Sequence, residues 1–145
     1  MNNNWFECGI RYDKVMEDGK RKKVTEQYLV KGFSFTDAEA KIIEEISAYI
    51  DSEYTVSTIK RANYSEIFAT YESDSEYWFK CKVAFVTINE RTGKEKKTAC
   101  YMLIQAKSTE DATQKLNNEM NGTVSDYQIA SVSETNIYDV FFNEK

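Results

Sequence analysis

The sequence predicts an α+β fold: a tandem duplication of a ββαβ(β) unit, with antiparallel sheet, two helices packed on it and a pseudo-twofold relation between the copies. Three observations lead to this prediction: a repeated set of motifs, strands with period-2 alternation, and a helical apolar stripe. The clearest motif is Trp5-Phe6-Glu7-Cys8, which returns seventy-three positions later as Trp78-Phe79-Lys80-Cys81.

Further matches extend the duplication along the chain. The turn Gly19-Lys20-Arg21-Lys22-Lys23 returns as Gly93-Lys94-Glu95-Lys96-Lys97, and Ser34-Phe35-Thr36-Asp37-Ala38 returns as Ser108-Thr109-Glu110-Asp111-Ala112. Both are shifted by one more residue, so a small insertion separates the copies, and a compensating deletion near Asn121-Gly122 restores the spacing. The sequence therefore predicts a single domain, residues 1–145, built of two repeats at about 5–71 and 76–142.

Each repeat begins with a predicted β-hairpin. Apolar residues alternate with polar ones from Phe6 to Tyr12 and again from Phe79 to Phe85, as in a strand with one buried face. A polar segment with a single glycine follows, and then a second run rich in β-forming residues, Tyr28-Leu29-Val30 or Tyr101-Met102-Leu103-Ile104. Strand, glycine turn and strand together are typical of a hairpin.

A helix is predicted after each hairpin. Thr36-Asp37-Ala38-Glu39 has the Thr-x-x-Glu spacing of a capping box, and an apolar stripe then continues for about four turns to Ile50. In the second copy the stripe is thinner, and Asn121-Gly122 predicts a shorter helix. The stripes should lie on the sheet.

Two further β segments follow each helix. They cover residues 56–61 and 64–71 in the first copy, and residues 129–133 and 137–142 in the second. Between the copies, Glu72-Ser73-Asp74-Ser75 separates the β segment at 64–71 from Tyr77-Trp78-Phe79. This spacing predicts a hairpin that joins the copies by continuous strand pairing.

The residues of the first half resemble a known family. The matching residues are Trp5-Phe6-Glu7-Cys8, the turn Glu17-Asp18-Gly19-Lys20, and Tyr28-Leu29-Val30 leading into Ser34-Phe35-Thr36-Asp37-Ala38-Glu39-Ala40. The chain resembles an uncharacterised domain-of-unknown-function family of short proteins from Bacteroidetes and their phages. The resemblance implies no activity, because the family has none assigned, and it transfers no functional residue.

Composition predicts a folded protein of the cytoplasm that does not enter a membrane. Of the 145 residues 41% are hydrophobic and 14% aromatic, which is too apolar for a disordered chain. No apolar run approaches the roughly eighteen residues of a membrane span, and the polar start Met1-Asn2-Asn3-Asn4 does not resemble a secretion signal. Three cysteines without a Cys-x-x-Cys pair are typical of reduced thiols.

The sequence offers no catalytic constellation. Histidine is absent, which excludes the usual general base and every Ser-His or Cys-His pair. The five glycines are too scattered for a phosphate-binding loop, and the carboxylates show no convergent metal-ligand spacing. Cys8 and Cys81 lie on the predicted apolar strand faces and should be core residues. We therefore expect no catalytic residue, no cofactor and no metal site.

The candidate contact residues lie in two basic hairpin turns and at two tryptophans. The turns hold eight of the nineteen Lys and Arg residues, although the net charge of the chain is −5. Such basic turns could bind a polyanion or an acidic protein. The alternative is that they are ordinary solvated turns. The tryptophans could stack on unpaired bases, or they could cover a sheet edge. The candidates are Lys20, Arg21, Lys22, Lys23, Arg91, Lys94, Lys96, Lys97, Trp5 and Trp78.

Three hypotheses of function follow. The first is a non-catalytic interaction or small structural module, phage-related, with a protein partner or a second copy of itself. The alternative is a nucleic-acid-binding accessory protein that uses the basic turns and the tryptophans, against which the acidic pI near 4.9 weighs. The third is an enzyme that relies on a thiol or on carboxylates such as Glu44, Glu45 and Glu119.

Overall fold

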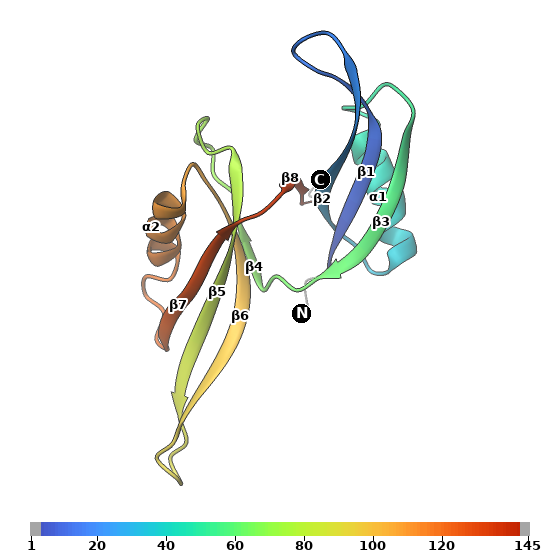
Figure 1. Cartoon of the computed structure of the whole chain (residues 1–145). Helices are drawn as coiled ribbons and strands as arrows, with labels where there is room; N and C mark the ends of the chain where they lie inside the picture. The colour runs from blue at the N-terminus through green and yellow to red at the C-terminus, as the bar shows by residue number, and fades with distance from the viewer. Residues whose placement is uncertain (1–3, 143–145) are drawn as a thin grey trace. The chain divides into compact units, whose positions relative to one another are not determined.

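The structure is a computed structural model that describes residues 4–142 and divides into two compact units (Figure 1). The first unit contains the described residues up to Asn63 and those from Asn136 onward, and the second contains Tyr64–Thr135. Each unit has one helix and one four-stranded sheet. The predicted α+β class is confirmed, with two separate four-stranded sheets.

The first unit has the strand order β3-β1-β2-β8. Its elements are β1 (Trp5–Val15), β2 (Arg21–Lys31), α1 (Phe35–Ile46), β3 (Tyr54–Ala62) and β8 (Ile137–Phe141). β1 pairs antiparallel with both β2 and β3, whereas β8 pairs parallel with β2. Helix α1 covers one face of this sheet, where Ala38, Ile42 and Ile46 are buried.

The second unit repeats this order as β7-β5-β6-β4. Its elements are β4 (Glu66–Phe68), β5 (Tyr77–Ile88), β6 (Glu95–Ala106), α2 (Thr109–Glu119) and β7 (Asp126–Glu134). β5 pairs antiparallel with β6 and β7, and β4 pairs parallel with β6. Helix α2 is one residue shorter than α1 and buries Ala112 and Leu116.

The fourth strand of each sheet comes from the other repeat. β4 belongs to the first repeat by sequence but completes the second sheet, and β8 belongs to the second repeat but completes the first. The predicted hairpin across Glu72-Ser73-Asp74-Ser75 is therefore wrong. Both edges of β5 are already paired, to β6 and β7, so the short strand before this segment joins the free edge of β6 instead.

Both predicted hairpins are present. β1 and β2 pair from Trp5 with Lys31 to Val15 with Arg21, and β5 and β6 pair over a similar length. Their turns contain Gly19 with φ 81° and Gly93 with φ 70°. Glycine populates this left-handed region without strain, which explains why each turn contains one.

The two central strands also share an irregularity. The pairing of β1 with β3 shifts between Gly9 and Ile10, and that of β5 with β7 shifts between Lys82 and Val83, at the same sheet position. A Cβ added at Gly9 would lie 2.6 Å from Thr58 Oγ1, so a larger residue at this bulge would require the Thr58 side chain to move. The two units therefore share their strand order and the position of this bulge.

Helix α1 begins two residues earlier than the sequence predicts. The N-cap of α1 is Ser34 and not Thr36: the Ser34 hydroxyl accepts a hydrogen bond from the Asp37 amide at 3.1 Å. Asp37 Oδ2 accepts the Phe33 amide at 2.8 Å. A serine and an aspartate three residues apart thus satisfy free amides at the helix start, which makes the Thr-x-x-Glu spacing superfluous.

Removing either cap should destabilise one helix modestly. Ser108 caps α2 by accepting the Asp111 amide, just as Ser34 caps α1. We expect Ser34→Ala and Ser108→Ala each to lower the free energy of unfolding by about 1 kcal/mol, because one amide loses its acceptor. Urea denaturation followed by circular dichroism measures this change. Thr36→Ala is the matched control, and a loss as large as that of Ser34→Ala would contradict the assignment of the cap.

Candidate functional site

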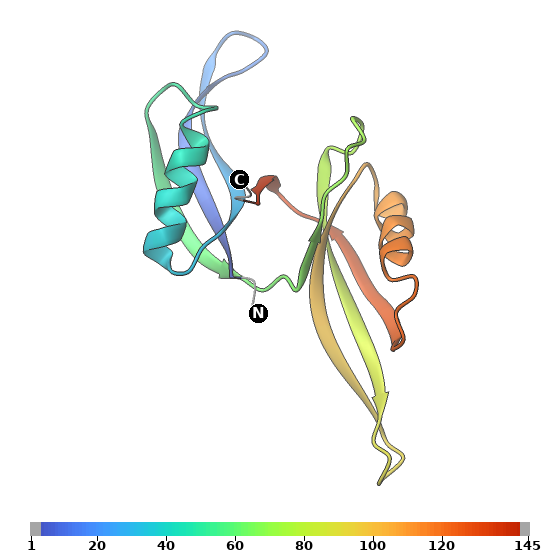
Figure 2. The same cartoon turned by 180° about the vertical axis from the view of Figure 1, so that it is seen from behind.

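All eight basic turn residues are exposed. They lie around the turn of the β1–β2 hairpin and that of the β5–β6 hairpin, one in each unit, and Figure 2 shows each loop extending beyond the helix of its unit. Within residues 4–142 none of the eight forms an ion pair with a carboxylate. The turns thus present unpaired positive charge to solvent.

The two candidate tryptophans are not available to a ligand. Trp5 and Trp78 are each only 3% exposed. The Trp5 ring packs edge-on against Phe142 with 5.6 Å between centroids, and the Lys31 ammonium lies 5.3 Å above it. Buried rings cannot stack on bases, so the tryptophans contribute to packing, which is the alternative role the sequence left open.

The thiols and carboxylates do not form a reactive centre. Burial raises the pKa of Cys8 to about 12 and that of Cys81 to about 11, which holds both thiols protonated and unreactive. Glu44 and Glu119 are exposed and lie on different helices. In the part of the chain that the structure describes, no three Cys, Asp or Glu residues are grouped so that they could hold a metal ion.

A buried carboxylate organises one end of the first sheet. Glu26, whose side chain is 10% exposed, accepts hydrogen bonds from the Tyr12 hydroxyl at 2.8 Å and the Tyr28 hydroxyl at 2.9 Å. Lys14 Nζ lies 2.9 Å from its other oxygen, and 5.1 Å above the Tyr138 ring. Burying a charge is costly unless it is paired and hydrogen-bonded, and here both oxygens have partners.

This network occurs in the first unit only. The strand pairing places Phe85, Cys100 and Met102 in the second sheet where the first has Tyr12, Glu26 and Tyr28. Tyr12 also lines an open cleft of about 570 Å³ beside Arg11 and Glu53. No sequence pattern indicates the network, although Tyr12, Lys14 and Glu26 lie on facing strands of the predicted hairpin.

The network predicts loss of stability at alkaline pH. Burial, and then the hydrogen bond to Glu26, raises the pKa of Tyr12 and of Tyr28 above the usual 10.0, and the bond to Glu26 raises the pKa of Lys14. A group whose pKa is raised by folding stabilises the folded state at pH values below its pKa in the unfolded chain. This stabilisation is lost as the pH rises from that value through the pKa of the folded state. Urea midpoints should therefore hold below pH 10 and fall above it. The double variant Tyr12→Phe, Tyr28→Phe should fall less steeply, and an unchanged slope would contradict this origin.

An aromatic and cationic surface lies at the amino end of α1. Phe33 is 85% and Phe35 46% exposed, on either side of the capping serine. The Lys41 ammonium lies 5.1 Å from the centroid of the Phe33 ring, and the Arg61 guanidinium lies 5.3 Å from that of Phe35. We call Phe33, Phe35, Lys41 and Arg61 the aromatic patch. The two exposed phenylalanine rings and the two cations thus lie together around the start of α1.

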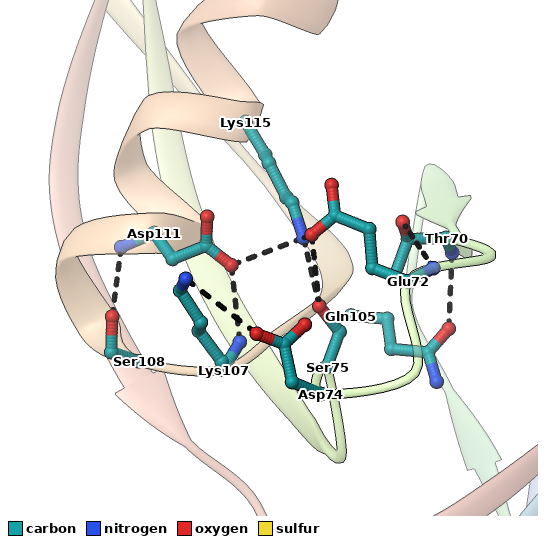
Figure 3. Close-up of polar contacts among 9 residues, drawn as sticks. All are labelled: Thr70, Glu72, Asp74, Ser75, Gln105, Lys107, Ser108, Asp111 and Lys115. Carbon is teal, nitrogen blue, oxygen red and sulfur yellow. Dashed lines mark hydrogen bonds and ion pairs between the residues drawn. The ribbon is translucent and has the colours of Figure 1, made fainter.

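The same place on the second unit is polar and covered. Lys107, Thr109 and Lys115 stand where the first unit has Phe33, Phe35 and Lys41. Residues 70–75, which we call the acidic segment, lie over this helix end (Figure 3). Lys115 Nζ contacts Glu72 Oε2 at 3.1 Å and Ser75 Oγ at 2.9 Å, besides its helix neighbour Asp111 at 3.0 Å. Figure 3 shows Lys115 pointing from the helix into this group of oxygens.

Two further contacts hold the acidic segment. Lys107 Nζ lies 3.6 Å from Asp74 Oδ2, and the Thr70 amide donates to Gln105 Oε1 at 3.0 Å. Ser75 is 3% exposed, whereas the side chains of Glu72 and Asp74 are 56% and 62% exposed. The second unit thus contains an example of an acidic peptide bound at the amino end of its helix.

Local electrostatics at the two helix starts are alike. The pKa of Asp37 is lowered by the Phe33 amide and by Lys41, and that of Asp111 by the Lys107 amide and by Lys115. Both carboxylates remain ionised and hold their lysine. Lys41, however, contacts Asp37 alone among the carboxylates of residues 4–142, at 3.1 Å.

The described residues define a two-unit α+β protein with one helix and one four-stranded sheet in each unit. The chain belongs to the family described as Domain of unknown function (DUF4494), whose model matches residues 4–144. No curated protein and no solved structure matches the chain. Among residues 4–142 no helix has the length and apolar character needed to cross a membrane.

Proposed function

We propose that this protein is a non-catalytic interaction module that binds a protein partner through the aromatic patch of its first unit. The observation that carries the proposal is the difference between the two helix starts. Two exposed phenylalanines with cations above them occupy the first, whereas the chain's own acidic segment covers the second. Interfaces are enriched in aromatic residues and arginine, which are the components of this patch.

The rest of the molecule supports a scaffold role. The thiols of Cys8 and Cys81 are buried and protonated, and the Tyr12, Tyr28 and Lys14 groups around Glu26 are engaged with one another. We place the protein in the cytoplasm, with its cysteines reduced, and relate it to phages, as the family resemblance implies. A duplicated unit in which one copy is specialised for binding accounts for the shared fold and the different surfaces.

A peptide-display selection tests the proposal. The intact protein is presented with a random peptide library, in parallel with the double variant Phe33→Ser, Phe35→Ser. We expect the natural protein to enrich a consensus that the variant does not. Tyr71→Ser, which removes a fully exposed aromatic side chain elsewhere, is the matched control and should enrich the same consensus. No consensus, or the same one with the double variant, would contradict the proposal.

Nucleic-acid binding is the second candidate function, favoured by the unpaired charge of the two basic turns. Fluorescence anisotropy with a single-stranded oligonucleotide tests it at two salt concentrations. Phosphate binding predicts tighter association at low salt, weakened by substituting Lys20, Lys22, Lys94 and Lys96 with glutamine. No association at low salt would eliminate this function. Substituting Lys60 and Lys82 with glutamine controls for the loss of charge elsewhere.

A further inference from the structure

We infer that the partner of the aromatic patch is an extended acidic segment with the pattern Glu-x-apolar-Ser, bound as the acidic segment is bound on the second unit. This inference rests on the proposed function and names the chemistry of its partner. It follows from comparing, position by position, what holds residues 72–75 to α2 with what α1 offers at the same places.

The glutamate and the serine of the pattern are inferred from a lysine that both helices have at the same position. On the second unit Lys115 contacts Glu72 and Ser75 in addition to Asp111. Lys41 occupies the same helix position and pairs with Asp37 in the same way, at 3.1 Å. Its side chain is 30% exposed, against 19% for Lys115, because no described residue lies over it as the acidic segment lies over Lys115. A carboxylate and a hydroxyl would complete the same set of contacts.

The apolar residue of the pattern is inferred from a difference between the units: the first has Phe33 where the second has Lys107. Lys107 pairs with Asp74, the residue between Ser73 and Ser75. Phe33 cannot pair with a carboxylate, and a carboxylate held against its ring would lose hydration without gaining a hydrogen bond. An apolar side chain at this position would instead cover a phenylalanine that is 85% exposed.

Charge at the other side of the patch also favours an acidic partner. Arg61 lies above the rings of Phe6 and Phe35, at 5.2 and 5.3 Å, and forms no ion pair within residues 4–142. The strand pairing places Glu134 at this position of the second sheet. The first unit therefore has a cation where the second has an anion, and like-charge repulsion would not oppose an acidic segment here.

A titration of the intact, isotope-labelled protein with two synthetic peptides tests the inference by amide chemical shifts. The first peptide has the sequence of residues 70–76 with leucine in place of Asp74, and the second keeps the aspartate. We expect the leucine peptide to shift the amides of Ser34, Lys41 and Arg61 and to bind at least about fivefold more tightly than the aspartate peptide.

The variant Phe33→Lys sharpens the test, because it restores the second unit's residue at an exposed position that the core does not use. It should reverse the preference, so that the aspartate peptide binds more tightly. Replacing the glutamate of the leucine peptide by glutamine should weaken binding, and Tyr71→Ser in the protein should leave it unchanged.

The outcomes separate the inference from the proposed function. No shift at about 2 mM peptide, or shifts confined to Lys115 and the acidic segment, would overturn the inference. So would an unaltered preference in Phe33→Lys. If display selection yields a consensus that depends on Phe33 and Phe35 but lacks the Glu-x-apolar-Ser pattern, the proposed function stands and this partner is wrong.

Discussion

Phe141→Ala should unfold the first unit more readily and leave the second nearly unaffected. Phe141 is 8% exposed, belongs to the core under α1, and stacks on Tyr28 with 5.6 Å between centroids and on Tyr49 with 6.0 Å. Truncating a buried phenylalanine removes its apolar contacts and leaves a cavity, so we expect a loss of about 3 kcal/mol of unfolding free energy. Because the residue lies on β8, the loss falls on a sheet made mostly of the opposite end of the chain.

Each unit contains one tryptophan, which allows the two to be followed separately. Urea unfolding by fluorescence in a Trp78→Phe background reports on the first unit through Trp5, and the reverse background reports on the second. Phe68→Ala is the matched control, because Phe68 pairs with Ile104 as Phe141 pairs with Val30. Phe68→Ala should lower the unfolding free energy of the second unit, which Trp78 fluorescence reports. Equal losses at both tryptophans after Phe141→Ala would contradict a unit-specific effect.

Glu26→Ala is expected to lower the free energy of unfolding by about 2 to 3 kcal/mol. The substitution leaves the hydroxyls of Tyr12 and Tyr28 without their acceptor and removes the partner of Lys14. The Lys14 side chain is 37% exposed and rehydrates, whereas Tyr28 is 4% exposed, so its buried hydroxyl accounts for most of the loss. Chemical denaturation at neutral pH measures the change.

A double-mutant cycle separates the hydrogen bond from the packing. Tyr28→Phe should be destabilising in the natural protein and nearly neutral once Glu26 is alanine, because the hydroxyl then has no acceptor to lose. Glu53→Ala, which removes an exposed carboxylate of the same unit, should change stability by no more than about 0.5 kcal/mol. Additive effects of the two tyrosine-network substitutions would show that Glu26 does not act through Tyr28.

The hairpins and helices of both units could be predicted because their signals are local. Alternation along Phe6–Tyr12, a glycine in each turn and the apolar stripe of α1 lie within one element each. The helix start was displaced by two residues because Thr36 and Ser34 both suit a cap, and backbone geometry decides between them.

The sequence does not predict which sheet β4 and β8 join. They are three and five residues long and pair in parallel with a strand that is distant in the sequence. No tight turn connects either of them to its partner strand, so no turn fixes the register. The two sheets also have the same strand order, so the edge of β2 and the edge of β6 are similar acceptors and alternation does not distinguish between them.

The candidate site was predicted least well, for a related reason. The tryptophans and the basic turns stood out by type, but burial removed the tryptophans and left the turns as one alternative. Phe33 is a single aromatic residue in the segment between β2 and α1, and no sequence pattern marks it. Its exposure depends on the path of the chain between β2 and α1, and its contrast with Lys107 appears only once the two units are aligned by strand pairing.

The exchanged strands also fix an order of assembly during synthesis. The second unit is a continuous stretch, Tyr64–Thr135, and all four of its strands are synthesised before β8. Most of the first unit is synthesised earlier, but the edge of β2 stays unpaired until residues 137–141 emerge. The usual sequence, in which the amino-terminal part matures before the rest, is thereby inverted. An incomplete chain would contain a finished second half beside a first half whose open sheet edge invites pairing with a neighbouring nascent chain.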